Sequence, residues 1–168
     1  MMIKLGKDKE IGVIIIDKTE LRKLFKKWVK ILRIENNWDV LLELVDDEVF
    51  KKTGDFKIDC DDKKAVLLLN CRNPHRLNLE EVIVHELLHL KLYPLDQITE
   101  GLIEAHYEEN TGKHNFVYTQ FMLSLEQTVE ELAKCFLGYF GENKEYSYGR
   151  CKNKKGFNEL YAGLKAIK

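Results

Sequence analysis

The chain has 168 residues, of which 45% are hydrophobic and 33% charged, and its formal net charge is −1. This length and composition are ordinary for a soluble globular protein with one core, so we expect a single domain over residues 1–168. The near-zero charge excludes a general nucleic-acid-binding surface. The longest early apolar run, residues 11–16, is too short to span a membrane and lacks a signal-peptide layout, so we expect a cytoplasmic protein.

The first half of the chain predicts one helix followed by three strands. Asp17 and Glu20 form a capping-box pattern, and helical spacing of apolar residues continues from there to Ile34. Asn36 and Asn37 then end the helix. Alternating or continuous apolar residues predict strands at residues 38–45, 56–60 and 65–69, with turns at 52–55 and 61–64 and a loop at 70–78.

The most informative segment follows this loop and reads His-Glu-Leu-Leu-His at residues 85–89. Asn78 and Glu81 form a second capping-box pattern, and the apolar spacing after them predicts a helix. Pro94 is expected to end that helix soon after Tyr93. The motif therefore lies in the middle of a helix that is apolar enough to be buried.

Residues four apart share one face of a helix, so His85 and His89 can bind one metal ion together. Glu86 follows the first histidine and can reach a water bound to that metal. This spacing is the zincin signature, with two histidine ligands and a glutamate general base. We therefore predict a Zn²⁺ cofactor, with His85 and His89 as ligands and Glu86 as the catalytic residue.

The remainder of the chain predicts helices. We expect a second helix at residues 96–109, a long third helix at 116–140 ended by Gly141, and a short terminal helix at 157–167. The order of elements indicates an α+β fold: a small mixed β-sheet with a backing helix, the HExxH helix and a C-terminal helical part. Residues 141–168 form a possible C-terminal extension. Four cysteines without C-x-x-C spacing are expected to be free thiols, most of them buried: Cys60, Cys71, Cys135 and Cys151.

A catalytic zinc usually has three protein ligands, and the sequence lacks the third histidine of the extended metzincin motif. Glu126 is the first candidate, because it flanks an apolar face of the long third helix. Glu130, one turn later, is placed to hydrogen-bond a ligating histidine from outside the ligand set. Glu100 is the alternative third ligand if a helical hairpin at residues 93–95 brings it opposite His89. Two weaker candidates lie on the same segment, Glu104 and His106.

Over about residues 19–140, the chain resembles the gluzincin clan of zinc metallopeptidases, and more closely its compact minigluzincin type. The resemblance is specific at residues 85–89 and otherwise follows the order of elements. It implies a zincin-like domain in which a glutamate on a later helix completes the zinc site. The pair Glu126 and Glu130 is similar to that glutamate arrangement, and residues 99–101 are similar to a glutamate motif of other members. It also implies that substrate lies along an edge strand, here residues 65–69 or the strand before.

These observations predict a zinc-dependent metallopeptidase that hydrolyses peptide bonds through a zinc-bound water, with a peptide or protein as its substrate. The alternative is a latent or non-cleaving zinc-binding regulatory protein of the same fold. The tail at residues 150–168, which has no counterpart in the family that the chain resembles, motivates that alternative, because Cys151 could occupy the open position of the zinc. The sequence does not predict the oligomeric state.

Overall fold

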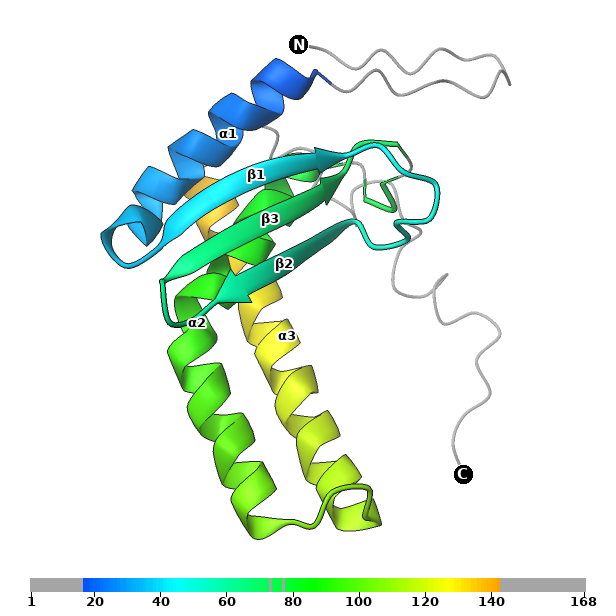
Figure 1. Ribbon diagram of the computed structural model, residues 1–168. Coiled ribbons are helices and arrows are strands. Elements are labelled where there is room, and N and C mark those ends of the chain that lie inside the picture. The colour runs from blue at the N-terminus through cyan, green and yellow to red at the C-terminus, as the bar shows by residue number, and fades with distance from the viewer. Residues whose placement is uncertain (1–16, 73, 77, 143–168) are drawn as a thin grey trace, which may run out of the picture.

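The computed structural model describes residues 17–72, 74–76 and 78–142 (Figure 1). Within these residues the chain forms three α-helices, one short 3₁₀-helix and a three-stranded sheet, which confirms a mixed α+β fold. The elements in chain order are α1 (Lys18–Ile31), η1 (Ile34–Asn36), β1 (Asp39–Val45), β2 (Gly54–Asp59), β3 (Lys64–Asn70), α2 (Leu79–His106) and α3 (Gly112–Phe140).

Helix α1 begins as the sequence predicts. The Asp17 carboxylate accepts hydrogen bonds from the backbone amides of Thr19 and Glu20, which satisfies two of the unpaired donors at a helix start. The helix ends at Ile31, three residues before the predicted end, and Arg33 takes a left-handed conformation with φ 53°. Its apolar face is buried in the core through Leu21, Leu24, Phe25 and Trp28.

The sheet has the order β1-β3-β2, with β1 parallel and β2 antiparallel to β3. The prediction of a small mixed sheet is therefore confirmed. The expectation that residues 65–69 offer an edge for substrate is wrong, because β3 is paired on both sides and its hydrogen-bonding groups are already used. Of the two strands considered, β2 is the one at an edge of the sheet that the described residues form.

Helix α2 differs most from the prediction. It runs without interruption from Leu79 to His106 and carries Pro94 inside it, whereas the sequence predicted an end near Tyr93 and a separate helix at residues 96–109. A proline inside a helix costs roughly 3 kcal/mol, because it removes one hydrogen bond and crowds the preceding turn. Packing of the long α3 helix alongside α2 keeps the two segments on one axis (Figure 1).

Helix α3 begins at Gly112, four residues earlier than predicted. The Thr111 hydroxyl caps it by accepting a hydrogen bond from the His114 amide. The helix ends at Phe140 with Gly141 as its C-cap, as predicted. Figure 1 shows the first half of α2 and the end of α3 behind the sheet, whereas the other halves of both helices project beyond it.

Some predictions fall on residues that the structure does not describe. These are the early apolar segment at residues 11–16, the terminal helix at 157–167 and the thiol of Cys151. The other three cysteines are free thiols, as predicted, but the expectation that most are buried is wrong, because Cys60 and Cys135 are exposed and Cys71 is half-buried. Among the described residues, no helix combines the length and apolar character needed to cross a membrane.

Candidate metal site

The first half of α2 places both histidines of the motif on the face turned toward α3. The Asn78 side chain caps this helix by accepting a hydrogen bond from the Glu81 amide, as predicted. One turn separates His85 from His89, and their Nε2 atoms lie 3.1 Å apart. Both side chains are partly buried, with 13% and 22% of their surface exposed. The local helix geometry therefore aims two imidazole nitrogens at one point.

Helix α3 brings Glu126 to the same point. Its Oε2 lies 3.4 Å from His85 Nε2, and its Oε1 lies 3.2 Å from His89 Nε2. The three side chains can each offer one ligand atom within 4.8 Å of the others. Ligands about 2.0–2.1 Å from a tetrahedral zinc lie roughly 3.3–3.4 Å apart, so this donor set fits Zn²⁺.

The electrostatic surroundings favour neutral histidines. Burial lowers the pKa of His85, and the neighbouring His89 lowers it further, while the Glu126 carboxylate opposes both effects. Burial also lowers the pKa of His89, again against the effect of Glu126. A neutral imidazole is the form that binds a metal ion, so the lowered pKa values favour the metal-binding form of both histidines.

Glu130 faces the far side of the His85 ring without forming the predicted hydrogen bond to it. Its Oε2 is 3.5 Å from Nδ1 of His85, a buried nitrogen that has no hydrogen-bond partner of its own among the described residues. Arg76 donates to this carboxylate at 2.9 Å, and Lys134 lies 2.7 Å from its other oxygen. Burial raises the pKa of Glu130, but the hydrogen bonds from Lys134 and Arg76 outweigh it and lower the pKa to about 2. Glu130 therefore stays charged and can orient the His85 ring.

Glu86 lies on the sheet side of the histidines, in a pocket of about 160 Å³ whose wall includes Gly54 and Arg76. A methyl group added to Gly54 would come within 2.6 Å of Glu86 Oε1, so only glycine lets β2 pass this close. Burial raises the pKa of Glu86 to about 7, and the nearby carboxylates of Asp55 and Glu126 contribute. A carboxyl group with this pKa can take or give a proton near neutral pH.

The structure keeps Glu100 away from this cluster. Glu100 lies on the projecting half of α2, where its carboxylate accepts hydrogen bonds from Gln97 and from the Tyr118 hydroxyl. The hairpin expected at residues 93–95 does not form, because α2 is continuous. The weaker candidates Glu104 and His106 lie exposed further along the same half. Within the described part of the chain, the side chains that could together hold a metal ion are His85, His89 and Glu126.

Sequence reasoning missed two residues of the site. Gly54 was assigned to a turn, although a glycine at the edge of a strand pattern can also mark a close backbone approach. Arg76 lies in the loop before α2, where its guanidinium donates to both Glu81 and Glu130. Nothing in the sequence around Arg76 connects it to a carboxylate 54 positions later.

Comparisons of the chain with protein-family models, with curated proteins and with solved structures find no match.

Proposed function

We propose that this protein is a zinc-dependent metallopeptidase with a zincin-like domain of the minigluzincin type. His85, His89 and Glu126 are its zinc ligands, and Glu86 is its general base. One observation carries the proposal: ligand atoms from two helices converge at distances that suit zinc, with the glutamate of the motif beside them.

A zinc ion bound there supplies a Lewis acid that polarises a carbonyl oxygen and lowers the pKa of water. Glu86 accepts the proton of the attacking water and passes it to the leaving amine. Its pKa of about 7 suits both steps at neutral pH. Glu130 positions His85 and acts through it, because its carboxylate faces the far side of the imidazole ring.

The substrate is an extended peptide or a flexible protein segment. Among the described residues, strand β2 pairs with β3 alone, and this leaves the backbone donors and acceptors of its outer edge available to a further strand. This strand begins at Gly54, in contact range of Glu86. A peptide added along β2 would pass beside the general base, which supports peptide hydrolysis over attack on a small molecule.

The test measures zinc content by elemental analysis and the cleavage of unfolded casein, for the wild type and for Glu86→Gln. We expect one zinc per chain in both proteins and a loss of cleavage of about 10²–10⁴-fold in the variant, the usual contribution of a general base. Glu104→Gln, an exposed glutamate on the same helix, is the matched control and should retain both properties. Absence of zinc after reconstitution would refute the proposal, as would full activity of Glu86→Gln. One zinc without cleavage by the wild type would favour the non-cleaving alternative.

A further inference from the structure

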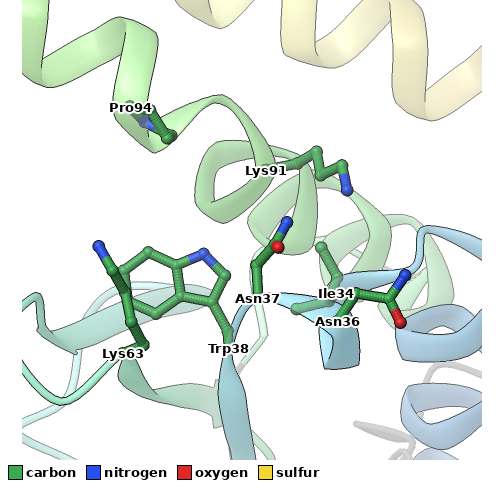
Figure 2. A pocket seen from close by; sticks show the side chains of 7 residues that line it. All are labelled: Ile34, Asn36, Asn37, Trp38, Lys63, Lys91 and Pro94. Atoms are coloured by element: carbon green, nitrogen blue, oxygen red, sulfur yellow. The ribbon is translucent and has the colours of Figure 1, made fainter.

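Two hollows border helix α2, and their basic side chains are held differently. In the hollow of about 420 Å³ shown in Figure 2, Lys63 lies over the Trp38 ring and Lys91 comes from α2, so the two cations approach it from different elements. In the hollow of about 160 Å³ beside Glu86, Arg76 forms part of the wall, and its guanidinium contacts two carboxylates. This second cation is therefore tied to the helices that form the candidate metal site.

Arg76 bridges the two helices that supply the proposed zinc ligands. Its Nη1 atom donates to Oε1 of Glu81 on α2 at 3.0 Å and to Oε2 of Glu130 on α3 at 2.9 Å. Glu81 lies one helical turn before His85, and Glu130 lies one turn after Glu126. One nitrogen atom from the loop before α2 thus joins both helices next to their ligands. We call Arg76 with these two carboxylates the Arg76 bridge.

The Arg76 bridge is partly shielded from water. The Glu81 side chain is 3% exposed and the Glu130 side chain 23%, whereas Arg76 is 47% exposed. Burial opposes the charged form of Arg76, but Glu130 and Glu81 outweigh this effect and raise its pKa. The bridge therefore joins ionised groups at neutral pH, and such hydrogen bonds are stronger than those between neutral groups.

The carboxylate oxygen that accepts from Arg76 also faces the zinc site. Oε2 of Glu130 lies 3.5 Å from Nδ1 of His85, longer than a typical hydrogen bond. The other oxygen of Glu130 lies 2.7 Å from Lys134, one turn later on the same helix. Lys134 can therefore hold this carboxylate on α3 only, whereas Arg76 also fixes its position relative to α2.

We propose that Arg76 is a positioning residue of the zinc site, because it holds Glu130 against α2 and so fixes the orientation of the His85 ring. The same bridge fixes the separation of His85 from Glu126, which lies one turn before Glu130. The role assigned to Arg76 rests on the proposed function, since it requires that the histidines and Glu126 bind zinc. A residue outside both ligand-bearing helices thus controls the metal affinity.

Zinc affinity of the full-length protein, measured by competition with a chelator of known affinity, provides the test. Arg76→Met removes the guanidinium and should weaken zinc binding about tenfold, the lower end of the effect of losing an outer partner of a ligand. Arg76→Lys retains a cation and should recover part of this loss. The matched control is Arg72→Met, which removes an arginine of the same loop with similar exposure, 44%, and should bind zinc like the wild type.

The visible absorption of bound Co²⁺ is a second readout, because it depends on the geometry of the ligands. The spectrum should change in Arg76→Met and stay the same in Arg72→Met. A loss of stability alone would leave the spectrum of the folded, Co²⁺-loaded protein unchanged.

A double-mutant cycle tests the route of the effect. Glu130→Gln removes the charge that Arg76 holds on α3, and it keeps the shape of a partly exposed side chain. If Arg76 acts through Glu130, then Arg76→Met should weaken zinc binding no further in the Glu130→Gln protein. Arg76→Lys gives the same comparison if Arg76→Met does not fold.

The outcomes separate the role of Arg76 from the proposed function. Wild-type zinc affinity of Arg76→Met, an equal loss in Arg72→Met, or additive losses in the double variant would overturn the role of Arg76 and leave the zinc site intact. A wild-type protein that binds no zinc after reconstitution would refute both proposals. The expected losses of affinity in a protein that cleaves no peptide would support the role of Arg76 and favour the non-cleaving alternative.

Discussion

The two halves of α2 share one helix axis but differ in how deeply their acidic side chains are buried. The segment before Pro94 holds nine of the ten buried residues of the helix, and the segment after it holds one, Ile103. Three glutamates of the first half are wholly or largely buried: Glu80, Glu81 and Glu86. In the second half, the acidic residues are exposed or partly exposed. Glu100 accepts hydrogen bonds from Gln97 and Tyr118, whereas one oxygen of Asp96 has no hydrogen-bond partner among the described residues.

The first half shows two ways of burying a carboxylate. Glu80 is almost fully buried and accepts hydrogen bonds from the Trp28 indole, the Lys27 ammonium and the Glu142 amide, so it joins α1, α2 and the end of α3. Glu86 accepts no hydrogen bond from the described residues, and its pKa rises to about 7. A satisfied carboxylate holds the fold together, whereas an unsatisfied one remains available for proton transfer.

The largest expected effect concerns zinc affinity, which should depend on the α3 glutamate that faces the first half of α2 and not on a glutamate of its second half. Glu126→Ala removes a proposed ligand and should weaken zinc binding by more than the roughly 10–100-fold that loss of an outer partner costs. Glu100→Ala, on the projecting half of α2, should leave the affinity unchanged. Competition with a chelator of known affinity measures both values. The reverse result would move the third ligand to Glu100.

Glu80→Ala tests the structural carboxylate. The change leaves the buried Trp28 N–H without its acceptor and should lower the free energy of unfolding by about 3 kcal/mol. Glu104→Ala, exposed on the second half, should change it by less than about 0.5 kcal/mol. Urea denaturation measures both variants. Equal stability of the two variants would show that the buried Glu80 contributes no more to the free energy of unfolding than the exposed Glu104.

Glu86 should make the metal-free protein less stable as the pH rises. The unfolded chain releases this proton near pH 4.5, whereas the folded chain holds it to about pH 7. Stability is therefore lost across this window, by up to about 3 kcal/mol. Denaturation of the wild type and Glu86→Gln in chelator, from pH 4 to 8, isolates this contribution because the histidines titrate in both proteins. Parallel pH profiles would contradict the raised pKa.

The smallest expected effect concerns the junction of the two halves. Pro94→Ala restores the backbone N–H that can donate a hydrogen bond to the Leu90 carbonyl. The change should raise the free energy of unfolding by about 1 kcal/mol. This gain is smaller than the full cost of a proline inside a helix, because the unfolded chain with alanine has more conformational freedom to lose on folding. Hydrogen exchange should slow at residues 95–106, with zinc affinity unchanged. Faster exchange there would mean that Pro94 stabilises the packing of α2 at this point.

Local chemistry made much of the fold predictable. Asp17 and Asn78 cap α1 and α2, as the sequence predicted. Such a cap depends on a hydrogen bond between residues only two or three positions apart, so a short stretch of sequence is enough to predict it. The strand segments followed from apolar patterns of similar range. The continuity of α2 through Pro94 did not follow, because the local cost of a proline is opposed by packing against α3, which no short window contains.

For the candidate site, the sequence by itself determined the pair His85 and His89 with Glu86 between them, since helix periodicity alone puts the histidines on one face. Only the tertiary structure places Glu126, and not Glu100, beside the two histidines, because that placement depends on how α3 packs beside α2. Only the tertiary structure brings Gly54, on the edge strand β2, against Glu86, and Arg76, in the loop before α2, into a hydrogen bond with Glu130. Contacts between residues distant in the chain follow from the packing of whole elements, and short-range patterns do not encode that packing.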